Sequence, residues 1–380
     1  MSKSDILNGM VIMSKVAVVK IRSDLEAEVE ELIHLAGADD VIAPGDTVLL
    51  KPNIHAIQPY TTGGTTNPYV VAAIIKWAYR RGAKEVIVGD SPFYGLSEPE
   101  RCFTETGMGE MVEQAGAKWV TFGAKGYKVF QKYSAFLPDE VGISEFVFNC
   151  DKMINIAAMK THFNCLVTLG MKNLKGCLRP EDKAAFHKID LDRAIVALNG
   201  LVRPHLTIVD GTVGMEGMGP ASGTPVNCNL LIAGRDIVAV DSVASFLMGI
   251  EPEEVMTIKL GHKAGLGEMD LDNIQVAGET LDDIRMQWKR PDSVIAERFP
   301  QLKIRNKGAC SGCNMNLLNA LNEIKRDGQE LRRKAIVMGQ DTPVEYECLL
   351  IGNCTSSFWR DYEHLSGCPP GIAAIKEILV

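Results

Sequence analysis

The chain has 380 residues, a formal net charge of -8, 46% hydrophobic residues and 23% charged residues. This length is enough for one large domain and one small one, and the composition is ordinary for a globular protein. The negative charge argues against a general nucleic-acid-binding protein, and no apolar run reaches the roughly 18 residues that a membrane span needs. Residues 1–20 lack an apolar segment followed by a small-residue cleavage site, so we expect a cytoplasmic protein without a signal peptide.

Short β-branched runs alternate with helical segments through the first 250 residues. The predicted helices include residues 24–37 and 67–83, each with a glycine near its end. The predicted strands are residues 15–21, 46–54, 85–92, 152–162, 206–214 and 236–250. This alternation predicts an α/β fold with a large, mostly parallel sheet and helices on both faces.

The last 80 residues predict a second, smaller α/β unit. Residues 281–302 are typical of a hinge between two parts of a chain. The elements expected after the hinge are a helix at 310–328, strands at 334–339 and 346–354, and a helix at 367–379. We therefore predict two domains, a substrate-binding domain at 1–300 and a small domain at 301–380.

Five of the ten cysteines lie in the small unit. Cys310 and Cys313 form a C-x-x-C motif directly before a predicted helix. Cys354 ends a strand after a glycine, and Cys368 stands between a glycine and two prolines before the last helix. These four can gather at one end of the small sheet as metal ligands, whereas Cys348 lies inside a predicted strand and is expected in the core.

Four thiolates could hold zinc or an iron–sulfur cluster. Only one C-x-x-C pair is present, whereas zinc ribbons usually have two. The "GNC" and "SGCPP" segments resemble the small iron–sulfur subunits of nickel–iron hydrogenases and of respiratory complex I, over about the last 75 residues. This resemblance implies a [4Fe-4S] cluster, with zinc as the alternative.

Cationic side chains follow one of the predicted strands of the large domain. Lys160 and His162 end the strand at 152–162, and Lys172 and Lys175 lie in the glycine-bounded segment "GMKNLKG". In parallel sheets, ligands bind beyond the carboxyl ends of the strands. We expect Lys172 and Lys175 to bind a carboxylate or phosphate, and His162 or Lys160 to move a proton. A solvated turn with ordinary surface lysines is the alternative.

Two other segments are candidates for binding the same substrate. Lys51 and Asn53 follow the strand at 46–54. Thr65 and Thr66 lie in "TTGGTTNP", where hydroxyl groups, glycine backbone and a helix N-terminus could hold an anion. A plain flexible loop is the other interpretation of this segment.

Acidic side chains also follow predicted strands. Asp90 and Asp210 are candidate catalytic groups, and Asp90 could instead be a metal ligand or a helix cap. Glu216 follows Asp210 in a loop rich in glycine. Together with the lysines, these carboxylates outline an active site of mixed charge. His55 is interpreted as a surface residue and Asp241 as a helix cap.

Four segments resemble the DUF362 family over roughly residues 15–260. In chain order they are "KPNI", "GDSP", "MKTHFNCLVTLGMKNLKGCL" and "VDGTVGMEGMGPASGTP". The resemblance implies an association with iron–sulfur modules but no settled reaction. A weaker similarity, His162 followed by "GMKNLKG", resembles lactate racemase and its relatives, in which such residues serve a nickel-pincer cofactor.

These features predict a [4Fe-4S]-dependent oxidoreductase of anaerobic metabolism that acts on a small anionic organic substrate. A non-redox lyase or isomerase, distantly similar to lactate racemase, and an electron-transfer or maturation protein are the alternatives. The expected partners are the small anion and a redox partner protein, without nucleic acid or membrane. The sequence does not determine the oligomeric state, and it is compatible with a monomer or a homo-oligomer.

Overall fold

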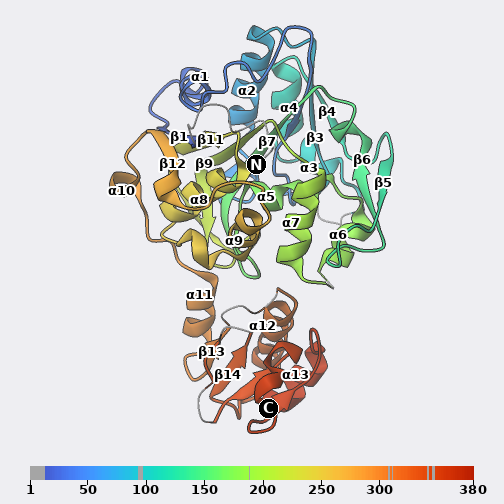
Figure 1. The fold of residues 1–380 in the computed structure, drawn as a ribbon, viewed down its shortest axis with the longest axis vertical. Coiled ribbons are helices and arrows are strands. Elements are labelled where there is room, and N and C mark those ends of the chain that lie inside the picture. Colours follow the sequence, from blue (N-terminus) through green and yellow to red (C-terminus); the bar gives the residue numbers. More distant parts are fainter. Residues whose placement is uncertain are drawn as a thin grey trace.

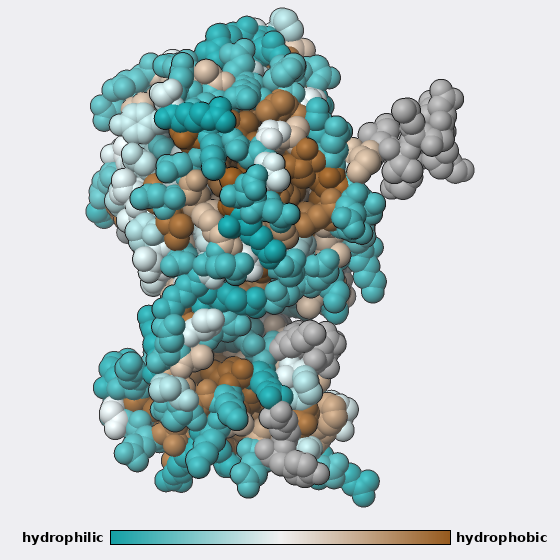
Figure 2. Space-filling model, turned by 90° about the vertical axis from the view of Figure 1, so that its left-hand side faces the viewer, coloured by the Kyte–Doolittle hydropathy of each residue, from teal (hydrophilic) through white to brown (hydrophobic). Residues whose placement is uncertain are grey.

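The structure consists of a large N-terminal α/β part and a small C-terminal α/β part (Figure 1). This computed structural model describes residues 13–92, 97–187, 189–306, 309, 311–339, 342–344 and 347–380. Cys310, one of the four predicted cluster ligands, lies outside the described residues. On the side drawn in Figure 2, hydrophilic residues cover most of both parts, with smaller groups of hydrophobic residues between them. Within the described ranges, no helix is both long and apolar enough to cross a membrane.

The large sheet is mostly parallel. Eight of its ten strands follow the order β12-β1-β11-β9-β7-β2-β3-β4, while β8 pairs with β7 and β10 pairs with β9. Only β8, β10 and β11 run antiparallel to their neighbours. The strands are β1 (Ser14–Lys20), β2 (Thr47–Lys51), β3 (Glu85–Asp90), β4 (Lys118–Thr121), β7 (Lys152–His162), β8 (Leu166–Thr168), β9 (Leu206–Glu216), β10 (Thr224–Val226), β11 (Leu230–Gly234) and β12 (Ile274–Gly278). The carboxyl ends of β2, β3 and β7 therefore meet at one edge of the sheet.

Helices cover both faces of this sheet and bury two separate hydrophobic cores. On one face lie α1 (Leu25–Leu35), α2 (Pro68–Arg80), α3 (Arg101–Thr104) and α4 (Met108–Gln114). On the other face lie α5 (Gly170–Asn173), α6 (Pro180–Phe186), α7 (Leu191–Leu201), α8 (Ile237–Leu247) and α9 (Met256–Lys263). A hairpin of β5 (Tyr127–Gln131) and β6 (Glu140–Ser144) lies beside them, and α10 (Leu281–Ile284) and α11 (Pro291–Arg298) lead to the small part.

The segment at 236–250, which we predicted as a strand, is helix α8. Ten of its residues are buried, because α8 packs between the sheet and the neighbouring helices. A helix buried on nearly all sides has no polar stripe, so its apolar run cannot be told from a buried strand by periodicity. The predicted strand at 152–162 has the same limits as β7.

The small part contains a second, fully parallel sheet of four strands in the order β13-β14-β15-β16. Its elements are β13 (Lys303–Arg305), α12 (Ser311–Arg326), β14 (Ala335–Met338), β15 (Leu349–Ile351), β16 (His364–Leu365) and α13 (Ile372–Leu379). One face packs against α12 and α13, and the other carries a small cluster of Val337, Cys348 and Leu350. The boundary predicted at residue 300 lies between α11 and β13. The predicted fold, a large mostly parallel sheet with a small C-terminal α/β unit, is confirmed.

Candidate functional site

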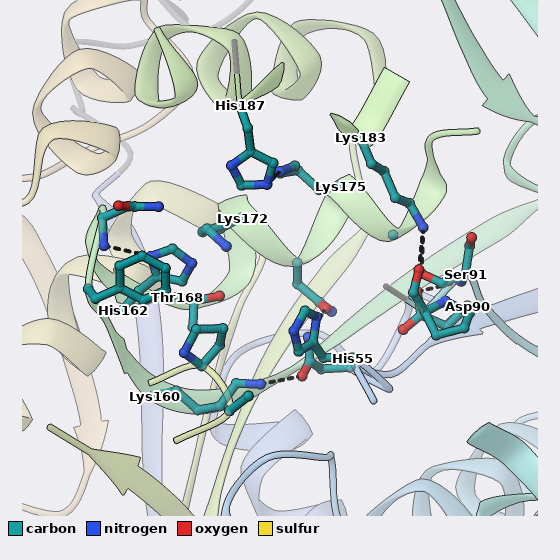
Figure 3. A pocket seen from close by; sticks show the side chains of 18 of the residues that line it. His55, Asp90, Ser91, Lys160, His162, Thr168, Lys172, Lys175, Lys183 and His187 are labelled. Carbon is teal, nitrogen blue, oxygen red and sulfur yellow. Dashed lines mark hydrogen bonds between the residues drawn. The ribbon is translucent and has the colours of Figure 1, made fainter. Parts of the chain in front are cut away.

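A cavity of about 330 Å³ lies at the carboxyl edge of β2, β3 and β7. We call it the lysine cavity, because five lysines contribute to its wall. The charged and titratable residues that line it are Lys51, His55, Asp90, Lys160, His162, Lys172, Lys175, Lys183 and His187. Figure 3 labels these side chains, apart from Lys51, around one space, with the amine of Lys172 near the middle. Asp90 is the one carboxylate among the described residues that line this cavity, and Asp192 acts on Lys172 from outside the lining.

The single carboxylate is already used by one of the lysines. Lys51 Nζ lies 2.8 Å from Asp90 Oδ1, and both side chains are buried. Asp90 also accepts hydrogen bonds from the backbone N–H groups of Ile54 (2.8 Å) and Ser91 (2.8 Å). Gly176 packs against this pair, since a Cβ there would lie 2.1 Å from Asp90 Oδ1. Asp90 therefore holds Lys51 and the loop after β2 in place.

Two further lysines are held by neutral groups. Lys160 Nζ donates to Asn53 Oδ1 (2.6 Å) and to the carbonyl of Gly64 (2.9 Å). Lys183 Nζ donates to two backbone carbonyls, those of Ser91 (2.6 Å) and Pro92 (3.0 Å). None of these contacts supplies negative charge.

Lys175 and Lys172 complete the cationic wall. Lys175 Nζ lies 3.1 Å from His187 Nε2, within hydrogen-bond distance. Lys172, in α5, makes no hydrogen bond or ion pair with any residue in the described ranges. Asp241 positions α5 from outside the cavity, because its carboxylate accepts the backbone N–H groups of Gly170 (2.7 Å) and Met171 (2.9 Å).

Burial and mutual repulsion disfavour the charged forms of these groups. Burial, together with the charge of Lys172, lowers the pKa of Lys160 to about 7, and burial lowers that of Lys183 to about 7. Burial also lowers the pKa of Lys172, and that of Lys175 falls well below its usual value. A bound anion would offset both effects, so the cavity is suited to a small anionic ligand.

The three histidines are neutral for the same reason. Burial, with the nearby lysines, lowers the pKa of His55 and of His187 to about 3. The pKa of His162 falls well below its usual value, mainly through burial. His162 Nδ1 accepts the backbone N–H groups of Asn164 (3.0 Å) and Cys165 (3.2 Å), so the ring proton is on Nε2.

Most of the predicted site residues line the lysine cavity, but three do not. Thr66 accepts the N–H of Asn53 (2.8 Å) and donates to the carbonyl of Ile156 (3.0 Å). Asp210 accepts the N–H groups of Asn67 (2.7 Å) and Thr212 (2.9 Å). Thr65 is also buried outside the cavity lining. Thr66 and Asp210 satisfy buried backbone groups behind the cavity wall. Glu216, which accepts the N–H of Lys289 (2.6 Å), does not line the cavity either.

Three cavity residues were not predicted. His55, interpreted above as a surface residue, lines the cavity. Lys183 and His187 come from α6 and its C-terminal cap. Their spacing of four residues puts both on one face of a helix, and this was the available signal in the sequence.

Three cysteines of the small part, Cys313, Cys354 and Cys368, lie at the carboxyl edge of its sheet. We call Cys313, Cys354 and Cys368 the cysteine site. A Cβ on Gly352 would lie 3.0 Å from the sulfur of Cys313 and 3.5 Å from that of Cys354. The loop of Cys354 is tied to that of Cys368, because Asn353 N–H donates to the carbonyl of Gly367 (2.9 Å) and Gly367 N–H donates to Asn353 Oδ1 (2.7 Å).

The start of α12 joins the same cluster of loops. Asn316 Nδ2 donates to the carbonyl of Pro370 (2.8 Å), two residues beyond Cys368. Gly352 has a φ of 95°, so glycine fits this backbone and leaves space beside the two sulfurs. Within the described ranges no three His, Cys, Asp or Glu side chains form a site for a single metal ion, and Cys310 is outside those ranges. The convergence of thiols around a glycine fits a bulky inorganic cluster.

Helix α12 connects the cysteine site with the lysine cavity. It carries Cys313 in its first turn and, two residues later, Met315, which lines the lysine cavity. Asn164 Nδ2 approaches Met315 Sδ at 3.8 Å across the boundary between the two parts. A larger cleft of about 720 Å³, the interdomain cleft, lies between the parts and shares His162, Phe163 and Asn164 with the lysine cavity.

Comparison with known proteins assigns the large part to a family. The model for DUF362, a domain of unknown function, matches residues 48–245, which is just over half of the chain. The chain belongs to the DUF362 family. The matched region contains all five lysines of the cavity, whereas Met315 and the cysteine site lie beyond the DUF362 domain.

Two similar proteins extend this comparison. A thylakoid-associated protein of Synechocystis sp., sll1697, is 28% identical over 271 residues, which are 70% of this chain and 82% of that protein. The lactate racemase apoprotein from Thermoanaerobacterium thermosaccharolyticum has a similar structure at a TM-score of 0.40 and 13% identity. That match covers 62% of this chain and 57% of the racemase chain.

Proposed function

We propose that this DUF362 protein is an iron–sulfur oxidoreductase that exchanges electrons with a small organic anion bound in the lysine cavity. The observation that carries the proposal is the course of α12. Its first turn holds Cys313, and Met315 lies in the wall of the lysine cavity. An anion in the cavity and a cluster at the cysteine site would be separated by little more than this turn of helix.

The ligand class follows from charge. Among the described residues, Lys51 is the one cavity lysine with an ion pair to a carboxylate, and burial makes the charges of the other four costly. A carboxylate or phosphate group would supply the missing counter-charge. The cavity volume of about 330 Å³ suits a small metabolite rather than a polymer.

Cys313, Cys354 and Cys368, with Cys310 as the predicted fourth ligand, would hold the [4Fe-4S] cluster. When bound, such a cluster supplies or accepts one electron at a time. The chain's own residues have separate tasks. Lys172 and Lys175 bind the anion, Asn53 and Asp90 orient the lysines around it, and Lys160 moves a proton, since its pKa is about 7.

The cluster is tested on protein purified without oxygen. We expect iron and sulfide in equal amounts, an EPR signal after reduction, and absorbance near about 400 nm. Cys313→Ser removes this absorbance. Cys348→Ser is the matched control and keeps it, because Cys348 packs with Val337 and Leu350 on the opposite face of the sheet. Bound zinc without sulfide contradicts the proposal.

The anion site is tested separately by calorimetry with phosphate, sulfate, and small carboxylates including 2-oxo acids. We expect at least one of them to bind, and Lys175→Met to weaken it by about tenfold or more, as for the loss of one charge-assisted hydrogen bond. Lys84→Met, at an exposed site outside the cavity, is the control and keeps the affinity. A protein with an intact cluster that binds none of these anions contradicts the enzyme and supports an electron carrier. A cluster that cannot be reduced reversibly supports a lyase or isomerase.

A further inference from the structure

Lys172 differs from the other four lysines of the cavity. The amine of each of those lies within hydrogen-bond distance of a side chain or backbone carbonyl that fixes it. Lys172 has no hydrogen bond or ion pair within the described part of the chain, although its side chain points into the cavity (Figure 3). Its amine is therefore the one that can change its bonding without breaking a contact of the cavity wall.

We propose that Lys172 is a nucleophile that forms an imine with the carbonyl carbon of a 2-oxo acid bound in the lysine cavity. This inference rests on the proposed function, because it requires that the cavity binds an anion. It adds the class of substrate and a covalent role for one residue.

The surroundings of Lys172 favour its neutral, nucleophilic form. Burial lowers the pKa of its amine, while the nearby Asp192 and Cys165 act in the opposite direction and offset only part of this effect. Lys172 also lowers the pKa values of Lys160, Lys175 and His162, which shows that these groups interact with it through space. A lysine that is desolvated beside other cations is a recurrent way to obtain a reactive amine.

The geometry of a 2-oxo acid matches this arrangement. Its carbonyl carbon is bonded directly to the carboxylate carbon, so both groups reach the protein at almost the same point. A carboxylate attracted by Lys175 and Lys160 would present its neighbouring carbonyl to the amine between them. An anion without a carbonyl would be bound by the same cations but could not react with Lys172.

The covalent step balances without an oxidant or reductant. The lone pair of the Lys172 amine forms the C–N bond, and the electrons of the C=O π bond move to oxygen. One amine proton moves to that oxygen to give the carbinolamine. A second proton, from the Lys160 ammonium, completes the water that leaves as the C–O bond breaks. The nitrogen keeps one proton in the iminium product, and Lys160 regains its proton from water.

The test uses the full-length protein, purified without oxygen, with pyruvate, glyoxylate and 2-oxoglutarate as probes. Sodium borohydride reduces an imine to a stable secondary amine, and peptide mapping by mass spectrometry then locates it. We expect one adduct at Lys172, at least about tenfold above any exposed lysine outside the cavity, such as Lys84. Calorimetry on the same samples measures binding independently of the covalent step.

Lys172→Arg is the matched variant, because it keeps a cation that cannot form an imine. We expect this variant to bind the 2-oxo acid without an adduct. Binding to the unchanged protein with no adduct, or with adducts on several lysines, overturns the imine and leaves the anion site standing. The absence of both binding and adduct overturns both proposals. The map of the unchanged protein decides the assignment even if the variant does not fold.

Discussion

His162 illustrates how local geometry restricts the chemistry of a residue. Two backbone N–H groups occupy Nδ1, and burial holds the pKa of the ring well below its usual value. His162 is therefore neutral near pH 7 and presents an N–H at Nε2, which can donate a hydrogen bond to a ligand oxygen. The sequence predicted a proton-transfer group at this position. The same prediction named Lys160 as the alternative, and a pKa of about 7 allows that amine to gain and lose a proton.

The depressed pKa values of Lys160 and Lys183 predict that anion affinity depends on pH. Both values are about 7 in the ligand-free protein. A bound anion stabilises the ammonium forms and raises these pKa values, so binding takes up protons. Affinity should be highest below about pH 7 and fall above it, by up to about tenfold per pH unit for each lysine that must be protonated. Calorimetry between about pH 6 and pH 9 with sulfate, which stays fully ionised, measures this slope.

The same experiment has an internal control in the neighbouring groups. Lys51 is paired with Asp90, and the histidines of the cavity titrate far below this range. Lys160→Met should reduce the slope by about one proton per anion. A slope that is unchanged in this variant, or an affinity that rises with pH, would show that other groups control binding.

Residue by residue, the sequence located the cations better than the carboxylates. Lys51 and Lys160 were predicted because polar residues at strand ends meet at one edge of a parallel sheet. Asp210 has the same position in its strand but turns toward the backbone N–H groups of the loop before α2. The direction of the Asp210 side chain depends on which buried N–H groups lack an acceptor. These groups become buried only when the chain folds, so the sequence alone does not show them. His55 was missed because a single histidine in a loop carries no pattern.

At the level of elements, helix α8 shows that an apolar run does not distinguish a buried helix from a buried strand. The strand predicted at 236–250 is a buried helix, and Asp241 within it caps α5 rather than α8, whose own cap is Asp236. Spacing along the chain cannot reveal a cap supplied by a distant helix. The helices and strands with polar faces or clear end signals, among them α1, α2 and β7, could be located from the sequence alone.

Gly352, in the loop after β15, leaves space beside the sulfurs of Cys313 and Cys354. A Cβ on Gly352 would lie 3.0 Å from the sulfur of Cys313, on a backbone with a φ of 95°. We expect Gly352→Ala to lower the iron and sulfide bound after anaerobic reconstitution by about half or more, because backbone strain of about 1–2 kcal/mol is added to the displaced sulfurs.

Gly328→Ala is the control that separates the effect of backbone strain from that of contact between a Cβ and the cysteine sulfurs. Gly328 also has a positive φ, 66°, but a Cβ there meets nothing within 4 Å. This control should cost a similar strain and keep its iron. If both variants lose iron equally, the loss reflects general destabilisation of the small part and not the space beside the sulfurs.

On the scale of the whole molecule, helix α12 connects the lysine cavity of the large part with the cysteine site of the small part. An anion in the lysine cavity adds negative charge near the cysteine site and disfavours reduction of a cluster there. We expect saturating anion to lower the reduction potential by on the order of 10 to 100 mV, as for one charge within about 15 Å at an effective dielectric constant of about 20. Potentiometric titration followed by EPR measures the shift, and by linkage the reduced protein should bind the anion more weakly.

The anion-binding variant Lys175→Met serves as the control for this effect. It should retain the cluster but need more anion for the same shift, because its affinity is lower. A potential that does not change at saturating anion would show that the two sites are electrostatically independent. A shift that is equally large in the variant at low anion would assign it to salt screening.

A short loop after β7 forms the partition between the lysine cavity and the interdomain cleft. His162, Phe163 and Asn164 line both the lysine cavity and the interdomain cleft, so at these residues a single segment of chain separates the two. Molecules occupying the two compartments would be near neighbours on either side of one imidazole. A substitution in these three shared residues would change the shape of both the lysine cavity and the interdomain cleft. We therefore expect the ligand selectivities of the two sites to change together.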